Sequence, residues 1–354
     1  MNKIHQILSG FSLYDAISNE ALQIASALKK WGYSSSIYTD QKHTHPLLKT
    51  LSYPYQDLNV VDDDIVIYHF SIGSETTQFF SELTCKKVLI YHNITPPQYF
   101  QYLDKTIMNQ LKKGREDLFK LKEIPNLVLA DSEYNRQELL NHQFRNVKVL
   151  PIMLKEDDLN LPPNKEIIST YQNSYTNFLF VGRLVPNKKF EDLLKTFYFY
   201  QKTINPQSRL ILAGSYTGLT DYLTYLRIII EKLDLKNVIF TGSIEQKDLI
   251  AYYKIADIFL CMSEHEGFCV PLLEAMYFNV PIFALNTTAV PHTLAGSGVL
   301  IKSKDYQAIA EGIGIILKNP ELKNRIITQQ KTRLKNLSQE ETEKKLQEYL
   351  QTLL

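Results

Sequence analysis

The chain has 354 residues, a net charge of +1 and 22% charged residues. This length predicts two domains, and the near-neutral charge gives no field that would attract nucleic acid. Its apolar runs stay below the roughly 18 residues of a membrane-spanning helix, and residues 1–10 hold too short an apolar region for a signal peptide. We therefore expect a cytoplasmic enzyme without a nucleic-acid partner.

In the first half of the chain, strand-like runs alternate with helical stretches. Residues 3–8 predict a strand, residues 9–14 a loop, and residues 15–30 a helix closed by Trp31-Gly32. Further apolar runs occupy residues 65–68, 87–91, 127–130 and 147–150. This alternation is typical of βα units around a parallel sheet.

Two segments of this half each allow two interpretations. Asp15 is either the cap of the helix that follows it or a residue that orients an acceptor. The stretch 105–122 mixes basic and apolar residues, which suits contact with an anionic membrane surface. Because Gly114 interrupts it and acids are interleaved, we favour an ordinary solvated helix.

Two predicted strands of this half end in histidine. His69 follows one apolar run, and His92 follows the next, with Asn93 and Thr95 behind it. Both histidines are expected at the carboxyl edge of the sheet, where α/β proteins bind ligands. A buried histidine satisfied by hydrogen bonds is the alternative, and it is weaker for His92. Neither predicts a metal ligand, because no carboxylate or cysteine stands at a suitable spacing in the sequence.

The middle of the chain predicts a domain boundary. Residues 155–177 are polar and contain Pro162-Pro163, which indicates a linker. A second alternating series follows, with apolar runs at 178–181, 209–213, 238–241, 258–262, 281–284 and 299–301. Ser338 and Glu341 form a capping box that opens a last helix. We expect a first domain over residues 1–160, a second over 161–335, and a C-terminal helix over 336–354.

The most informative stretch lies between residues 263 and 279. Glu266 follows a buried strand, and Glu274 lies about one turn inside the next helix, behind Pro271. Gly267, directly after Glu266, lets backbone amides approach a ligand, and a helix N-terminus favours an anion. The pattern predicts a site for hydroxyl groups and phosphate. The alternative is an exposed loop glutamate followed by a helix-start glutamate.

A second stretch carries two cations on a strand-to-helix loop. The buried run 178–181 is followed by Gly182, and then by Arg183 and Lys188, with Lys189 as a neighbour that can share their role. Preorganised cations stabilise the charge that develops on a departing phosphate. Two unrelated basic residues on a surface loop are the alternative.

Together these motifs resemble the signature of family-4 retaining glycosyltransferases of the GT-B fold. The matching features are two glutamates separated by seven residues, with Gly-Phe after the first and Pro before the second, and a Gly-Arg pair followed four residues later by Lys. The resemblance implies an α/β fold of two Rossmann-like domains that face each other across a cleft, with the C-terminal helix crossing back to the first. The resemblance is strong over residues 181–295, and the second half of the chain, including residues 289–300, looks like bacterial transferases that build surface polysaccharide.

The resemblance also implies roles for individual residues. Glu266 would hold the hydroxyls of the donor sugar and Glu274 the nucleotide ribose, while Arg183 and Lys188 would neutralise the diphosphate and His92 would stand near the reacting carbon. The remaining donor contacts would come from Gly10, Gly214, Ser243, Ile244, Gly267, Phe268, Cys269 and Val270. The acceptor would meet Asp15, His69, Asn93 and Thr95.

Three features depart from or imitate a family pattern. Cys269 stands where a small residue is usual, and His292 stands where a glutamate is usual. Residues 62–64 (Asp-Asp-Asp) imitate the metal motif of the other large glycosyltransferase fold, but they precede their strand and indicate solvated turn acids. The three cysteines, Cys85, Cys261 and Cys269, fit no zinc spacing and indicate buried, inert thiols.

From this resemblance we expect a metal-independent retaining hexosyltransferase, without a cofactor, that uses a UDP- or GDP-linked sugar. Mannose or glucose is the favoured sugar, and a glycan or lipid-linked acceptor at the inner membrane surface is the expected partner. A non-catalytic partner subunit or a glycan-binding protein of the same fold is the alternative. The base, linkage and oligomeric state stay open.

Overall fold

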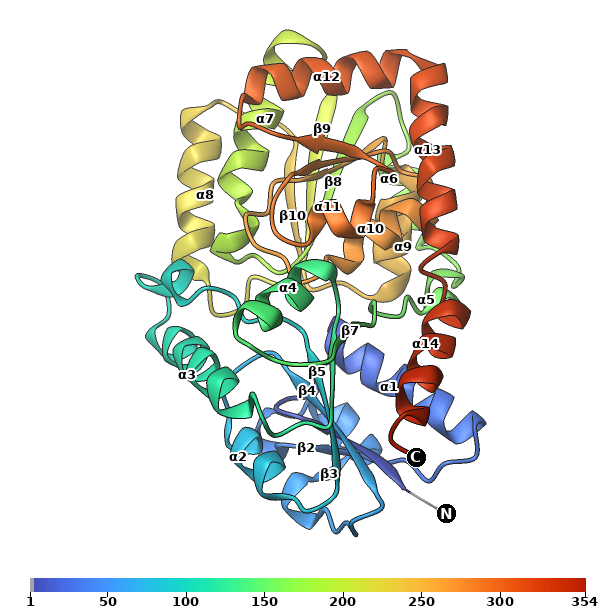
Figure 1. The fold of residues 1–354 in the computed structure, drawn as a ribbon. Helices are drawn as coiled ribbons and strands as arrows, with labels where there is room; N and C mark the ends of the chain where they lie inside the picture. Colours follow the sequence, from blue (N-terminus) through green and yellow to red (C-terminus); the bar gives the residue numbers. More distant parts are fainter. Residues whose placement is uncertain (1–2) are drawn as a thin grey trace. The chain divides into compact units, whose positions relative to one another are not determined.

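The computed structural model describes residues 3–354 and divides them into two compact units. The first unit comprises residues 3–155 together with Leu337–Leu354, and the second comprises Glu156–Asn336. The boundaries fall after residues 155 and 336, whereas the sequence led us to expect them after 160 and 335. In each unit, helices cover both faces of a parallel sheet (Figure 1).

The first unit holds a seven-stranded sheet in the order β3-β2-β1-β4-β5-β6-β7. Its strands are β1 (Ile4–Leu8), β2 (Ile37–Thr39), β3 (Tyr53–Pro54), β4 (Ile65–Phe70), β5 (Lys86–Tyr91), β6 (Leu127–Ala130) and β7 (Val147–Val149). Its helices are α1 (Ala16–Lys30), α2 (Glu75–Glu82), α3 (Lys105–Leu121), α4 (Glu133–Asn141) and α14 (Gln339–Gln351). The strand order reverses between β1 and β4, which is where doubly wound sheets bind ligands.

The second unit holds a six-stranded sheet in the order β10-β9-β8-β11-β12-β13. Its strands are β8 (Thr176–Val181), β9 (Ser208–Ala213), β10 (Val238–Gly242), β11 (Ile258–Cys261), β12 (Ile282–Leu285) and β13 (Val299–Ile301). Its helices are α5 (Glu156–Leu159), α6 (Lys165–Tyr171), α7 (Phe190–Thr203), α8 (Thr220–Lys232), α9 (Gln246–Ile255), α10 (Val270–Tyr277), α11 (Val290–Leu294), α12 (Tyr306–Lys318) and α13 (Pro320–Lys335). Here the order reverses between β8 and β11.

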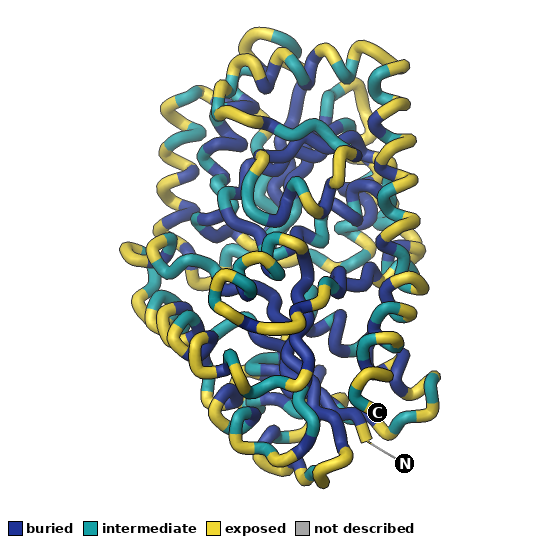
Figure 2. Tube along the Cα trace, in the orientation of Figure 1, coloured by how far each residue is buried: buried dark blue, intermediate teal, exposed yellow. Residues whose placement is uncertain are grey.

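In each unit the buried core lies along the sheet. The strands form the buried part of each trace, while exposed residues lie along the outer sides of the helices (Figure 2). In the first unit, Leu346 and Leu350 of α14 are 0% and 2% exposed and belong to the same apolar cluster as Ile4 of β1 and Ile24 of α1. α14 therefore lies beside α1 (Figure 1) and completes the core of the first unit from the far end of the chain.

Two features of the fold correct the sequence interpretation. The expected linker 155–177 contains the helices α5 and α6, and α6 is capped by Asn164, whose side chain accepts a hydrogen bond from the amide of Glu166. The strands β2 and β3 were not predicted at all, because runs of three and two residues are too short to show an alternating pattern.

Gly114 does not interrupt α3, which is continuous from Lys105 to Leu121. Instead, it lets the helix backbone contact another backbone segment. A Cβ atom on Gly114 would lie 2.7 Å from the amide nitrogen of Gly73, and that amide donates a hydrogen bond to the carbonyl of Gln110 at 3.2 Å. The interpretation of Gly114 as a helix break was therefore wrong: it is a close-packing position.

We expect Gly114→Ala to destabilise the first unit by about 2–3 kcal/mol, because the added methyl group meets rigid backbone rather than a movable side chain. The matched control is Gly312→Ala in α12, where the nearest atom to an added Cβ is a Phe283 ring carbon at 3.7 Å. The control should be neutral or stabilising by up to about 1 kcal/mol through helix propensity. Chemical denaturation of both variants measures the difference, and equal stabilities would contradict the packing argument.

Among the helices that the structure describes, none combines the length and apolar character needed to cross a bilayer.

Candidate functional site

Two loops meet at the reversal point of the second sheet. Residues 182–189, which we call the Lys188 loop, follow β8, and residues 262–269, the Glu266 loop, follow β11. The amide of Glu264 donates to the carbonyl of Asn187 at 2.8 Å, and the side-chain amide of Asn187 donates to the carbonyl of His265 at 3.0 Å. Asn187 is only 4% exposed, so these bonds form a fixed backbone junction. The fold thus brings together the two motifs that are about 80 residues apart in sequence.

The centre of this junction is an ion pair. Lys188 Nζ lies 2.6 Å from both carboxylate oxygens of Glu266. The side chains of Lys188 and Glu266 are 20% and 6% exposed. Burial by itself lowers the pKa of Lys188, but the adjacent Glu266 carboxylate outweighs it and raises the pKa above its ordinary value. The site therefore holds a fixed ammonium and a fixed carboxylate side by side.

Backbone contacts fix the position of Glu266. Its amide donates to Thr288 Oγ1 at 2.9 Å, and Thr293 Oγ1 donates to the carbonyl of Phe268 at 2.5 Å. Cys269 has a φ of 75° in the left-handed region, which turns the loop sharply into α10. The two threonines were not predicted as site residues. In the sequence, the only indication of these two threonines was that the segment 287–293 follows a predicted strand.

Glu274 lies in α10 and is held by a tyrosine that the sequence did not indicate. The Tyr253 hydroxyl donates to Glu274 Oε2 at 2.7 Å, and Tyr253 is 0% exposed. Burial raises the pKa of Glu274, against the lowering effect of this hydrogen bond. One carboxylate oxygen is thus engaged by Tyr253, and this hydrogen bond fixes the orientation of the carboxyl group.

If Glu274 binds a ligand hydroxyl, Tyr253→Phe should raise the KM of that ligand about 5- to 10-fold and change kcat by less than about twofold. The reason is that the variant frees the carboxylate to rotate without removing it. Tyr252→Phe is the matched control, because the neighbouring Tyr252 is also buried (7% exposed) but packs near the ring of Tyr171, away from Glu274. Equal KM values for the two variants would contradict a positioning role.

The two other basic residues of the Lys188 loop differ from each other. Arg183 is exposed and has no ion-pair partner within residues 3–354. Lys189 pairs with Glu264 at 3.3 Å and with Glu191 at 3.5 Å. Arg183 is therefore available to a ligand, whereas Lys189 serves the scaffold. The expectation that Lys189 shares the role of Lys188 does not fit these contacts.

The loops after β9 and β10 reach the same edge of the sheet. A Cβ on Gly214 would lie 2.1 Å from the carbonyl oxygen of Gly182, so only glycine permits this approach between backbones. Ser243 is exposed and Ile244 half-buried after β10. His292 lies exposed on α11, and its carbonyl accepts a hydrogen bond from Arg333 at 2.9 Å.

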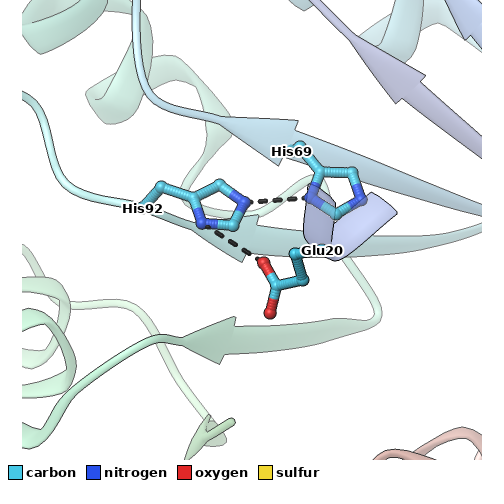
Figure 3. A group of neighbouring side chains, drawn as sticks. All are labelled: Glu20, His69 and His92. Atoms are coloured by element: carbon cyan, nitrogen blue, oxygen red, sulfur yellow. Dashed lines mark hydrogen bonds and ion pairs between the residues drawn. The ribbon is translucent and has the colours of Figure 1, made fainter. Parts of the chain in front are cut away.

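The first unit contains a separate, fully buried polar cluster at its own reversal point (Figure 3). His69 Nδ1 and His92 Nε2 are 2.9 Å apart, and His92 Nδ1 lies 3.0 Å from Asp131 Oδ2 and 3.6 Å from Glu20 Oε2. His69 Nε2 lies 2.9 Å from Gln6 Oε1. None of these side chains is more than about a tenth exposed, so each polar atom depends on its neighbours.

The hydrogen-bond partners fix where the protons lie in this cluster. Gln6 Nε2 donates to the carbonyl of Ala21, so Gln6 Oε1 accepts and His69 Nε2 must donate to it. His69 Nδ1 then accepts from His92 Nε2, and the remaining nitrogen of His92 faces Asp131 and Glu20. Burial opposes the charge of His92, but Asp131 and Glu20 together raise its pKa to about 9. His92 is therefore an imidazolium near neutral pH, and burial keeps the pKa of His69 well below its ordinary value.

This cluster revises three sequence-based expectations. His69 is 1% exposed, so it cannot be an acceptor contact in this conformation, and the buried alternative describes it. His92 is 8% exposed and has both ring nitrogens engaged, so the alternative of a buried, hydrogen-bonded histidine describes it as well. In the sequence no carboxylate stands at a ligand-like spacing from the histidines, but the fold brings Glu20 of α1 beside them.

The cluster predicts a pH dependence of stability. Burial raises the pKa of Glu20 from 4.5 to about 8, and that of His92 lies at about 9 instead of 6.5. Both folded values exceed the unfolded ones, so the folded unit binds more protons than the unfolded chain between these limits. The stabilisation from this cluster should therefore be complete below about pH 4.5 and be lost as pH rises through the folded values of about 8 and 9, by up to roughly 1.4 kcal/mol per pH unit for each proton. Urea unfolding from pH 6 to 9 measures this slope.

Glu20→Gln should flatten the slope, because it removes one of the two groups that titrate. Glu116→Gln, an exposed glutamate on α3, is the control and should keep the wild-type slope. An identical slope in all three proteins would show that the cluster does not control the stability of this unit.

The remaining predicted residues of the first unit have defined places. Asp15 is the cap of α1 and accepts from the amide of Ser18 at 2.9 Å, which is the capping alternative. Asn93 Nδ2 donates to Asn135 Oδ1 at 2.8 Å, so its side chain serves the fold. Gly10 and Thr95 are half-buried. In the triplet 62–64, Asp64 accepts from the amide of Lys3 at 3.0 Å, before its strand begins.

Comparison with known proteins gives one family match and several relatives. Residues 165–333 match the family described as "Glycosyl transferases group 1". The O-antigen chain mannosyltransferase B of Escherichia coli is 24% identical over 243 residues, which are 64% of this chain and 60% of that protein. A GDP-mannose:cellobiosyl-diphosphopolyprenol alpha-mannosyltransferase of Xanthomonas campestris is 32% identical over 140 residues, 38% of this chain and 36% of that protein. The chain thus spans less than two thirds of either relative.

Among solved structures, the Anabaena protein Alr3699/HepE in complex with UDP-glucose has a TM-score of 0.74 at 17% identity. The match covers 99% of this chain and 100% of that chain. The two parallel sheets with their helices are therefore those of the GT-B fold, as the sequence led us to expect.

Proposed function

Because residues 165–333 form a glycosyl transferases group 1 domain, we propose that the protein is a retaining glycosyltransferase. It transfers a hexose from a nucleotide-sugar to a glycan or lipid-linked acceptor in the synthesis of a bacterial polysaccharide. The observation that supports this most is the pair of Lys188 and Glu266, held 2.6 Å apart at the carboxyl edge of the second sheet. A sugar nucleotide offers one group for each charge: a diphosphate for the ammonium and sugar hydroxyls for the carboxylate.

Binding of the donor exchanges the partners of this ion pair. The diphosphate approaches Lys188 and the exposed Arg183, and the sugar hydroxyls donate to Glu266. Glu274, held by Tyr253, accepts from the ribose hydroxyls. The base occupies the loops at Gly214 and at Ser243-Ile244. Because both members of the pair stand fixed before the ligand arrives, little reorganisation is needed when charge develops on the leaving group.

The resemblance to retaining transferases implies the chemical step. The acceptor hydroxyl attacks the anomeric carbon on the face that the diphosphate leaves, and the departing phosphate oxygen takes the hydroxyl proton. In agreement with this, Glu264, the carboxylate next to Glu266 on the same loop, is paired with Lys189 and Lys304. Lys188 and Arg183 stabilise the negative charge on that phosphate, so the step needs no divalent metal.

The relatives and the fold neighbour give two candidate sugars. Two relatives are named for transfer of mannose, which supports GDP-mannose, and HepE was solved with UDP-glucose. One relative is named for a diphosphopolyprenol acceptor, which supports a lipid-linked acceptor here. An exposed groove in the first unit is lined by Tyr102, Lys105, Met108 and Lys112, and Tyr102 is 91% exposed. Its mixed aromatic and basic character suits the cytoplasmic face of an anionic membrane.

The test is a thermal-shift panel of UDP, GDP, ADP and their common sugar conjugates, each with and without EDTA. A ligand that binds only the folded state raises the melting temperature, by an amount that grows with its concentration over Kd. We expect one nucleotide series to stabilise the protein equally in both conditions, which also identifies the base. No shift with any nucleotide would favour a non-catalytic partner subunit or a glycan-binding protein.

A further inference from the structure

Two cysteines flank the Glu266 loop. Cys261 is the last residue of β11 and is 0% exposed, and Cys269 precedes α10 and is 8% exposed. Seven residues separate them in sequence, yet the sharp turn at Cys269 returns the chain to the end of β11. The two sulfur atoms and a carboxylate oxygen of Glu266 all lie within 4.8 Å of one another. The expectation of buried thiols is confirmed, and the fold in addition brings Cys261 and Cys269 together.

We propose that Cys261, Cys269 and Glu266 form an inhibitory binding site for a thiophilic divalent metal ion such as Zn²⁺ or Cd²⁺. Two thiolates and a carboxylate are a ligand set that zinc accepts, with a solvent molecule in the fourth position. Ideal tetrahedral zinc would place the two sulfur atoms about 3.8 Å apart, a spacing that is compatible with ligand atoms that all lie within 4.8 Å of one another. Sulfur ligands select such ions over Mg²⁺ and Mn²⁺, so the site differs from the metal sites of metal-dependent transferases.

The electrostatic balance of the site permits the ion to bind. Without metal, the site holds two neutral thiols, one Glu266 carboxylate and the Lys188 ammonium, which sum to zero. When the ion binds, the two thiols release two protons and form two metal–sulfur bonds. The charges of the ion, two thiolates, carboxylate and ammonium again sum to zero, so no net charge is buried. The Lys188 ammonium can remain, because a carboxylate offers about four lone-pair positions.

The two thiols interact with each other, which lowers the pKa of Cys261 and raises the pKa of Cys269 well above its ordinary value, so the bound ion has to displace the Cys269 proton. The Cys261 thiol also donates to Ser263 Oγ at 3.4 Å. Cys269 and Glu266, at 8% and 6% exposure, are the two ligands nearest to solvent and provide the entry. Among the described cysteines, Cys85 lies in the other unit and has no such partners.

The consequence is that bound metal competes with the donor. A metal–oxygen bond occupies the carboxylate lone pairs that the sugar hydroxyls need, and it draws Glu266 toward Cys269. This consequence depends on the proposed function, whereas metal binding itself does not. We expect thiophilic ions to inhibit the glycosyltransferase through this site and a chelator to restore its activity.

The first experiment uses Co²⁺ as a spectroscopic probe on the full chain reduced with a phosphine. Wild type should bind one ion with thiolate-to-cobalt charge-transfer absorption and the intense visible bands of tetrahedral cobalt. Cys261→Ala should weaken binding at least tenfold and lose the charge-transfer band, while Cys85→Ala keeps both. Cys261→Ser, closer in volume, replaces the alanine variant if the latter unfolds. No charge-transfer band in wild type, or the same band in both Cys261 variants, would overturn the site.

The second experiment measures the Kd of the nucleotide-sugar with and without Zn²⁺. We expect Zn²⁺ to raise that Kd at least tenfold in wild type and in Cys85→Ala, but less than about twofold in Cys261→Ala. An equal effect of Zn²⁺ in all three proteins would overturn the inhibitory role. If no nucleotide-sugar binds to wild type in the absence of Zn²⁺, the proposed function fails, and the cobalt spectra still decide whether the metal site exists.

Discussion

Replacing Lys188 by alanine should lower kcat/KM for sugar transfer about 10²- to 10³-fold. The variant removes the cation that we propose neutralises the leaving diphosphate, and it leaves the Glu266 carboxylate, 6% exposed, without its counter-ion. Part of the loss should appear as weaker binding of the nucleoside diphosphate alone. Steady-state kinetics and titration with that diphosphate measure the two components.

The adjacent lysine provides the control for Lys188. Lys189 pairs with Glu264 and Glu191 at the scaffold side of the loop, so Lys189→Ala should lower kcat/KM less than about tenfold. Lys189→Ala removes one positive charge from the adjacent position of the loop and keeps the Lys188 ammonium. Equal losses in the two variants would mean that only the total charge of the loop matters, and would contradict the assigned geometry.

Glu266→Gln should lower kcat about 10³-fold while the protein still binds nucleoside diphosphate. The amide keeps the shape of the side chain but loses the negative charge that accepts hydrogen bonds from the sugar and stabilises positive charge at the anomeric carbon. Because the diphosphate contacts belong to Lys188 and Arg183, they should survive. Rates of donor turnover, together with diphosphate affinity, separate these effects.

The control for this substitution is Glu311→Gln, an exposed glutamate of α12. It should keep the wild-type rate. Near-normal transfer by Glu266→Gln would remove Glu266 from the mechanism, and loss of diphosphate binding would indicate a collapsed site instead of a lost charge.

The sequence predicted the strand alternation well because each central strand is a buried apolar run. The runs ending at Val181 and Ala213, for example, fall inside β8 and β9. The short strands β2 and β3 could not be predicted, because they are defined by pairing with distant segments: β2 pairs with β1, and β3 pairs with β2 at the edge of the sheet. Gly114 was misjudged for a related reason: whether a glycine breaks a helix or packs against backbone depends on Gly73, which is distant in sequence.

Site residues on loops could be predicted where the residue type and its position after a strand are enough to indicate a ligand-binding role. Glu266 and Lys188 were chosen from separate motifs, and the junction at Asn187 explains how they meet. The partners of these residues were not predictable. Glu20 and Tyr253 lie within helices, where a glutamate or a tyrosine carries no sign of a contact on another element. The cysteine pair was missed because spacing rules for metal ligands do not include an eight-residue interval closed by a tight turn.

NMR of the product tests metal-free transfer with retention at the Lys188–Glu266 site. The protein is treated with EDTA and given GDP-mannose or UDP-glucose labelled with ¹³C at the anomeric carbon, with a lipid-linked glycan acceptor. We expect the label to pass from the α-linked donor into an α-glycoside without added metal. A β-linked product, a product that forms only after a divalent metal is restored, or no product with either donor would contradict it.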